Sequence, residues 1–404
     1  MESANAPGPY HSIVNQTSEA KPTTRPGASG DGAASTAADI RLEGVCQVLF
    51  AHDLALAIDL EEAERLIASA GPAPERQTLK HTRHAPASFE YRPAPLRVSE
   101  PAGSMRIGRF ELAPDVDVVL FDFGAVSVRY NIPFAGSLDD LRDLSARLSQ
   151  ETSLVADSRR RTEDLLAAIG PAVSQPGPSE FVEDYAIFEI RRAMDVQGRP
   201  VTPEELLARE TARLAGILRA ESAALSTQET ADALACRVSY AQSDAALIDW
   251  NAALVFDEDP EDVRSVLEFA NVELLEMRHL DERLDSALDE AYAVLSKGSV
   301  GLLGGRGTDL RRIARLQVDS AVLFEGVNNA LKLLGDQYLA RVYRLAAGRL
   351  HLPEWDASIL RKLQTLDSIY AKMSDRQATR RMEILEWIII LLIAFEVVMG
   401  FIRW

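Results

Sequence analysis

The final 21 residues constrain the structure that this chain can adopt more than any other segment does. They run from Ile384 to Trp404 and read ILEWIIILLIAFEVVMGFIRW. As a helix they would extend about 31 Å, which matches the roughly 30 Å hydrocarbon layer of a bilayer. Their apolar side chains together favour insertion by roughly 5 kcal/mol, against a cost of about 3 kcal/mol for the central Glu396. We therefore expect a single transmembrane helix over residues 384–404.

Five residues define the expected membrane anchor: Trp387, Ile390, Ile393, Glu396 and Trp404. Arg376, Arg380 and Arg381 precede the segment and only Arg403 follows it, so the positive-inside bias places the bulk of the chain on the cytoplasmic side. A buried C-terminal core helix is the alternative interpretation. Glu396 either is tolerated in lipid or faces another helix, in which case the anchor would be a site of self-association.

The net charge and the cysteine content of the chain limit what it can bind and the compartment in which it functions. The chain has 404 residues and a formal net charge of −18, and so acidic a surface repels phosphate backbones. We therefore do not expect direct nucleic-acid binding. Cys46 and Cys236 lie far apart and provide no disulfide framework, which fits a reducing compartment. Residues 1–40 lack an apolar stretch and are expected to form a disordered tail.

Residues 41–200 carry alternating strand and helix signals and are expected to form a mixed α+β domain. Apolar runs predict strands at 45–50, 116–121, 125–130 and 185–190, with a further candidate around 89–98. Capping sequences that begin at Asp59 and Ser137 predict helices ending near residues 69 and 148. In chain order these elements approximate β-α-β-β-α-β, the arrangement of ferredoxin-like sheets.

From Thr202 to residue 383 the pattern is helical, and we expect an antiparallel stalk of long helices. Apolar residues between 263 and 295 recur at spacings of four and three, which is typical of a heptad seam. The expected oligomer seam consists of Leu267, Leu274, Met277, Leu284 and Leu288. Two further long helices are predicted, over residues 310–345 and from Pro353 onward.

Several motifs resemble catalytic or metal sites and fail on closer inspection. Asp122-Phe123-Gly124 matches a kinase magnesium motif, but the other kinase motifs are missing, so a hairpin turn is the better interpretation. The glycine-rich run at 301–308 lacks the lysine of a phosphate loop. The pair His81 and His84 has no third metal ligand, and His52-Asp53, His279 and His351 look isolated along the sequence. We therefore predict no catalytic residue, no cofactor and no metal.

Several segments resemble the family named for a requirement in meiotic nuclear division, which includes bacterial YagE-type proteins. The similar segments are Val119–Val126, Ser239–Ser243 with Trp250, Leu274–Leu280 with Arg283 and Leu284, and Leu385–Ile393 with Glu396–Val398. The resemblance spans roughly residues 44–404. It implies a C-terminally anchored protein, at the inner membrane in a bacterium and at the mitochondrial inner membrane in a eukaryote, where relatives support translation. It implies no catalytic residues.

These observations favour a membrane-anchored scaffolding protein that forms homo-oligomers. Its expected contacts are membrane lipid, further copies of the chain and a protein partner bound by the α+β domain. The alternative is an enzyme or a nucleotide- or metal-sensing domain tethered to the membrane. Its site would need carboxylates that converge in space, such as Asp117, Asp122 and Glu189.

Overall fold

The computed structural model describes residues 40–77, 93–177, 179–296, 318 and 337–402. The predicted tail therefore lies outside the described residues almost entirely. So do His81, His84 and the glycine-rich run at 301–308.

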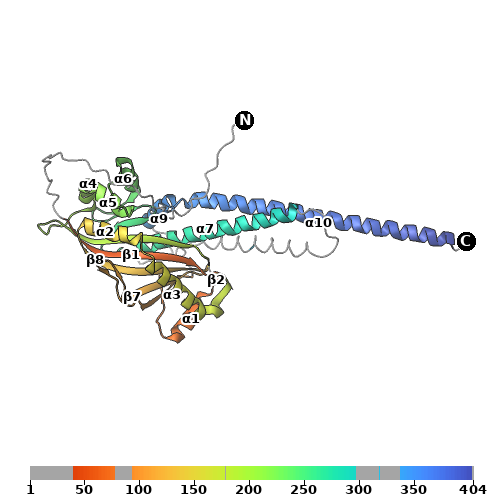
Figure 1. Ribbon diagram of the computed structural model, residues 1–404, viewed down its shortest axis with the longest axis horizontal. Coiled ribbons are helices and arrows are strands. Elements are labelled where there is room, and N and C mark those ends of the chain that lie inside the picture. The colour runs from red at the N-terminus through yellow and green to blue at the C-terminus, as the bar shows by residue number, and fades with distance from the viewer. Residues whose placement is uncertain (1–39, 78–92, 178, 297–317, 319–336, 403–404) are drawn as a thin grey trace, which may run out of the picture. The chain divides into compact units, whose positions relative to one another are not determined.

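A nine-stranded mixed sheet forms the centre of the described chain (Figure 1). The strand order is β11-β12-β13-β10-β1-β8-β7-β4-β3. The bounds are β1 Arg41–Asp53, β3 Glu75–Arg76, β4 Leu96–Pro101, β7 Asp115–Leu120, β8 Ala125–Gly136, β10 Val182–Met194, β11 Arg237–Val238, β12 Ala245–Ile248 and β13 Ala252–Phe256. Two short two-stranded sheets pair β2 (Ala55–Ile58) with β9 (Val173–Pro176) and β5 (Arg106–Ile107) with β6 (Phe110–Glu111).

The long strand β1 organises this sheet. It pairs antiparallel with β10 on one side and with β8 on the other. β10 then pairs parallel with β13. Its side chains alternate between two apolar layers: Val48 and Phe50 face one core, while Leu49 and Ala51 face the other. Because both faces are covered, the strand reads as a continuous apolar run.

Helices cover both faces of the sheet. The face that carries Val48 and Phe50 packs against helices that lie between the strands in the sequence. The opposite face, which carries Leu49 and Ala51, packs against the C-terminal helices. The first group comprises α1 Leu60–Ala70, α2 Leu138–Leu148, α3 Ser153–Ile169, α4 Pro203–Arg209, α5 Thr211–Leu218 and α6 Thr227–Ala233, with a 3-10 turn at Gly170–Ala172. The second group comprises α7 Glu261–Ser296, α9 Gln337–Arg349 and α10 Leu352–Ile402. Helices α7 and α10 lie side by side (Figure 1).

Local sequence signals explain several helix starts. The Asp59 carboxylate accepts the backbone N–H groups of Glu61 and Glu62 at the start of α1. Ser137 and Asp140 form a reciprocal capping box at the start of α2. Both predicted helices are thereby confirmed. The predicted strands at 45–50, 125–130 and 185–190 fall within β1, β8 and β10, and the one at 116–121 matches β7 except for its last residue.

The predicted fold class is nevertheless wrong. A ferredoxin-like sheet followed by a purely helical stalk does not account for β11, β12 and β13, which extend the sheet from within the region predicted as stalk. Strands β12 and β13 are Ala-rich and buried on both faces, as in Ala245–Ile248, so they show no alternation of apolar and polar residues. The molecule combines a large mixed sheet with C-terminal helices.

The predicted transmembrane helix over 384–404 is also wrong. Among the described residues, no helix has the length and apolar character that a membrane crossing requires. The side chain of Glu396 and the whole of Trp404 lie outside the described residues.

Candidate functional site

A buried cluster of two carboxyls and an imidazole lies between the sheet and α7. Asp53 is the last residue of β1, and Glu276 and His279 lie three residues apart on α7. That spacing places both side chains on one face of the helix. His279 Nε2 lies 3.1 Å from Asp53 Oδ2. Residues far apart in sequence thus meet in the interior of the protein.

Burial controls the charges of this cluster. Burial raises the pKa of Asp53 to about 7, with Arg283 acting in the opposite direction. Burial also raises the pKa of Glu276 well above its ordinary range, and the neighbouring charge of Asp53 raises it further. For His279, burial and then Arg283 lower the pKa to about 4. At neutral pH the imidazole is therefore uncharged and the two carboxyls keep at least one proton.

The hydrogen bonding of the cluster is incomplete. Within the described residues, Asp53 Oδ1, His279 Nδ1 and both carboxyl oxygens of Glu276 are buried without a hydrogen-bond partner. A protonated carboxyl can donate one hydrogen bond, whereas two carboxylates can only accept. The arrangement therefore favours a stored proton. Because Glu276 is fully buried and Asp53 is only 3% exposed, a substrate could not reach these groups.

A second histidine lies next to this cluster but faces the other layer. His52 Nε2 lies 2.9 Å from Ser158 Oγ on α3, and the Ser158 hydroxyl donates to the backbone carbonyl of Val155 at 2.9 Å. Burial, followed by Arg159, lowers the pKa of His52 to about 4. Asp53 contacts His279 instead of His52. Ser158 and His52 therefore lack the carboxylate that would orient a nucleophile-base pair.

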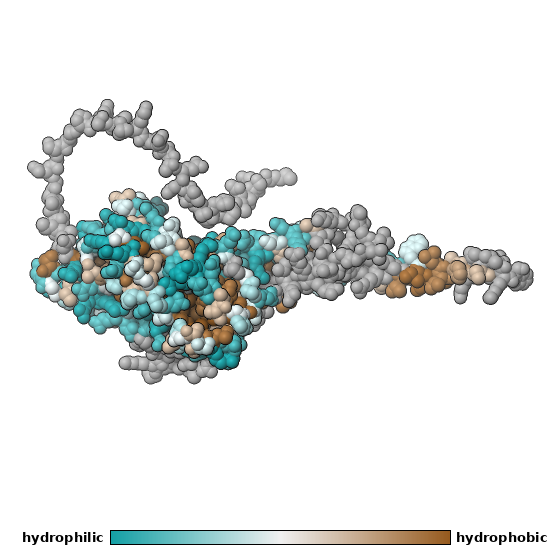
Figure 2. Space-filling model, turned by 60° about the horizontal axis from the view of Figure 1, so that its bottom comes forward, coloured by the Kyte–Doolittle hydropathy of each residue, from teal (hydrophilic) through white to brown (hydrophobic). Residues whose placement is uncertain are grey.

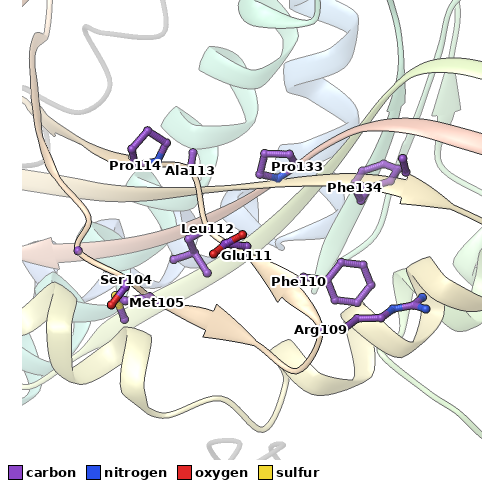
Figure 3. Close-up of a pocket in the computed structure, with 12 residues that line it drawn as sticks. Ser104, Met105, Arg109, Phe110, Glu111, Leu112, Ala113, Pro114, Pro133 and Phe134 are labelled. Atoms are coloured by element: carbon purple, nitrogen blue, oxygen red, sulfur yellow. The ribbon is translucent and has the colours of Figure 1, made fainter.

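An open hollow of about 760 Å³ lies beside the β5–β6 hairpin (Figure 3). Figure 3 shows Arg109, Phe110 and Glu111 on the hairpin, with Pro133 and Phe134 on the strand behind it. Arg109 forms an ion pair with Asp140, and its guanidinium lies 4.9 Å from the centroid of the Phe110 ring. A neighbouring hollow of about 540 Å³ shares Phe134 and Ala135 and includes Arg191 and Arg192. Both hollows mix charges of both signs, so neither indicates a particular ligand.

Within this chain Leu267, Met277 and Leu284 are buried, and Leu274 and Leu288 are partly buried against the same cores. Leu267 and Leu274 pack in the core that joins α7 to the sheet and α9. Met277, Leu284 and Leu288 pack in the core that includes residues of α10. Within this chain the apolar stripe of α7 packs against the other layers of the same molecule, because an apolar stripe specifies burial and not the partner. The role of these five residues as an oligomer seam stays a prediction.

The described anchor residues are exposed. Trp387 is 65%, Ile390 53% and Ile393 57% accessible. They belong to a run of exposed apolar side chains over residues 385–395 of α10. Figure 2 shows apolar residues gathered on the projecting end of this helix.

The three carboxylates proposed for an enzyme site do not meet. Asp117 lies on β7 and pairs with Arg129 at 2.9 Å, whereas Glu189 lies on β10 and pairs with Arg264 at 2.8 Å. Strands β8 and β1 separate them in the sheet, which corresponds to about 14 Å. Asp122 belongs to the turn between β7 and β8, where its carbonyl accepts the N–H of Ile58. The turn interpretation of residues 122–124 is thus confirmed.

Sequence reasoning missed the cluster of Asp53, Glu276 and His279 because it treated each histidine as isolated. One signal was available: Glu276 and His279 recur at helical spacing beside the apolar stripe of α7. The described residues contain no group of three or more potential ligands placed to hold a metal ion.

The sequence matches one family model and an uncharacterized archaeal protein. The family model described as "Uncharacterized protein MJ0711, N-terminal domain" matches residues 43–262. The uncharacterized protein MJ0711 of Methanocaldococcus jannaschii is 22% identical over 232 residues, covering 55% of this chain and 66% of that protein, just under two thirds of its length. No solved structure matches significantly. These matches do not test the resemblance to the meiotic-nuclear-division family, which stays a prediction.

Proposed function

This chain belongs to the family of the MJ0711 N-terminal domain, and from that premise we propose a non-catalytic assembly protein that pairs with a second copy of itself through the end of α10. The family match ends at residue 262, just inside α7. It therefore covers the sheet and does not include α9 and α10. The proposed contact lies in this unmatched part.

One observation supports the proposal above all: the run of exposed apolar side chains near the end of α10. Leu385 and every residue from Trp387 to Ile393 are between 47% and 65% exposed, and Phe395 is 64% exposed. Elsewhere on the described surface, the large exposed apolar residues are scattered. Contiguous exposed apolar surface of this kind marks an interaction site in most proteins.

A second copy fits this surface because a twofold interface uses the same patch on both partners. An apolar helix needs an apolar counterpart, and the same segment of another copy supplies one. Each large apolar side chain buried there would contribute roughly 1.5–3 kcal/mol. The buried cluster at Asp53 does not favour a catalytic role, because it is closed to substrates.

The test compares the full chain with a double variant, Ile389→Asn with Leu392→Asn. We expect light scattering after gel filtration to report a dimer for the full chain and a monomer for the variant. Leu360→Asn is the matched control, because Leu360 is a single exposed apolar residue elsewhere on α10, 44% accessible. It should leave the dimer intact.

Two results would contradict this proposal. One is a full chain that stays monomeric at every concentration tested. The other is a full chain that floats with lipid vesicles while the double variant does not, since the apolar run would then contact lipid instead of a second copy.

A further inference from the structure

A second group of acidic side chains, one buried and two partly buried, lies where α7, α9 and α10 meet. Glu273 of α7 is 1% exposed. The Tyr343 hydroxyl of α9 donates a hydrogen bond to Glu273 Oε2 at 2.7 Å. Asp356 of α10 is close enough for its charge to act on both Glu273 and Tyr343. Each of the three helices thus contributes one acidic group to the junction.

Among the residues that the structure describes, no positive charge pairs with the acids of this junction. Within the described residues, neither Glu273 nor Asp356 forms an ion pair, and Asp356 Oδ1 is buried without a hydrogen-bond partner. Two ionised carboxylates placed together in a poorly solvated site repel each other and lose their hydration. The packing is therefore compatible with protonated carboxyls and opposed to ionised ones.

Several cations on the three helices make contacts elsewhere. On α9, Arg341 lies 5.8 Å from the Tyr338 ring centroid, Arg344 donates to the Ala340 carbonyl, and Arg349 pairs with Asp232 and Asp249. On α7, Arg278 pairs with Glu183 of β10, and Arg283 acts on Asp53, Glu276 and His279. On α10, Lys362 pairs with Asp281 at 2.7 Å and with Asp285 at 2.6 Å. On the opposite face of the sheet, Arg159 of α3 acts on His52.

We propose that protons on Glu273 and Asp356 hold α9 and the start of α10 against α7, and that their loss releases these helices. This pH-dependent release depends only on contacts within one chain. It therefore goes beyond the pairing of two copies proposed above and does not require that pairing. Release would change how the end of α10 is presented, since α10 continues from this junction to residue 402.

The direction of the pH dependence follows from the charges. The pKa of Glu273 is raised from 4.5 to about 8, because burial and the charge of Asp356 raise it by more than the Tyr343 hydrogen bond lowers it. Burial likewise raises the pKa of Asp356. A carboxyl whose pKa is higher in the folded state stabilises fully below its unfolded pKa. That stabilisation is lost as the pH rises towards about 8.

Hydrogen-deuterium exchange of the full chain tests this mechanism. Protection of backbone amides in 337–349 and 352–372 is measured from about pH 5 to about pH 9 and corrected for the intrinsic exchange rate. We expect protection in the natural chain to fall about tenfold or more across this range, because each pH unit above the unfolded pKa costs a factor of about ten until the folded pKa is reached.

The double variant Glu273→Gln with Asp356→Asn removes both titrating groups while keeping their size. It should keep the same protection at every pH. Glu354→Gln is the matched control, because Glu354 lies on the same turn of α10 and its side chain is 69% exposed. That control should follow the natural chain.

Constant protection in the natural chain would overturn the proposal, and so would a double variant that still loses protection at high pH. If the double variant fails to fold, Asp356→Asn alone serves instead, because Asp356 is only partly buried. The single variant should shift the loss of protection to a different pH. An unchanged transition would again overturn the proposal. Light scattering at each pH reports whether the chain is a monomer or a dimer. It therefore distinguishes release of the helices within one chain from dissociation of two copies.

Discussion

The imidazole of His279 lies 3.1 Å from the carboxyl of Asp53, and the two residues come from different layers of the protein. Asp53 ends the central strand β1, while His279 lies on α7, which covers the sheet. With the pKa of His279 lowered to about 4, the Asp53 carboxyl faces an uncharged ring over most of the pH range. The stability of the protein should therefore depend on whether the Asp53 carboxyl is protonated.

Asp53→Asn should flatten the pH dependence of stability. Burial raises the pKa of Asp53 from 3.8 to about 7, so its stabilising contribution is complete below about 3.8 and lost as the pH rises to about 7. The amide has no such loss. When the pH is raised from near 4 to near 8, the unfolding free energy of the variant should therefore rise by roughly 2–4 kcal/mol relative to that of the natural chain. Urea denaturation at both pH values measures the difference.

The control for that measurement is Asp164→Asn, since Asp164 is 73% exposed in its pair with Arg160. It should follow the natural chain at both pH values. Equal pH dependence in Asp53→Asn and the natural chain would mean that the Asp53 carboxyl is ionised in the folded protein.

Arg129→Met should destabilise the sheet strongly. The Arg129 side chain, 2% exposed, contacts Glu268 and Asp117 at 2.9 Å each, and the Ser127 hydroxyl donates to Glu268 at 2.7 Å. Removing the guanidinium leaves Glu268 as an uncompensated buried charge, which costs about 3–5 kcal/mol. Denaturant unfolding reports this loss directly.

Arg147→Met is the matched control for the buried arginine, because Arg147 pairs with Asp143 on the surface of α2. Its unfolding midpoint should stay within experimental error. A similar loss in both variants would show that the buried network contributes no more than a surface ion pair.

Gly124→Ala should disrupt the turn between β7 and β8. Gly124 has a φ angle of +103°, and an added Cβ would lie 1.7 Å from the carbonyl oxygen of Ala55. The backbone must move to accommodate it, so we expect a loss of more than about 2 kcal/mol in unfolding free energy. Gly170→Ala is the control, since nothing lies within 4 Å of the added Cβ there. If both variants unfold alike, the close approach to Ala55 is not rigid.

Leu284→Ala should reduce stability without changing the number of copies in the assembly. Leu284 is fully buried in the core that also contains Ile359 and Leu366 of α10. The cavity should cost about 2–5 kcal/mol, measured by thermal or urea unfolding. Tyr292→Ala, at a position on α7 that is 52% exposed, is the control. Dissociation of an oligomer before unfolding would instead place Leu284 between copies.

The sequence predicted the elements with strong local signals. Alternating and continuous apolar runs revealed β1, β7, β8 and β10, and capping residues such as Asp59 and Ser137 revealed helix starts. The heptad pattern correctly predicted the helix now seen as α7. These features depend on neighbours within a few residues, which is the range over which a sequence can be interpreted directly.

The features that sequence analysis missed depend on long-range pairing. Strand β13 joins the sheet through its parallel contact with β10, and its short Ala-rich sequence gives no local strand signal. The cluster at Asp53 requires Glu276, more than 220 residues further along the chain. An apolar stripe on α7 indicates that it is buried, but not that α10 of the same chain covers it.

The place of β1 at the centre of the sheet has a consequence for biosynthesis. Its partner β8 is made about 80 residues later and its other partner β10 about 140 residues later. At roughly 5–20 residues per second, a ribosome would need about 7–30 seconds to go from the end of β1 to the end of β10. For that time β1, whose residues Val48–Ala51 are apolar on both faces, has an unpaired edge. We therefore expect newly made chains to depend on chaperones until residue 194 has emerged.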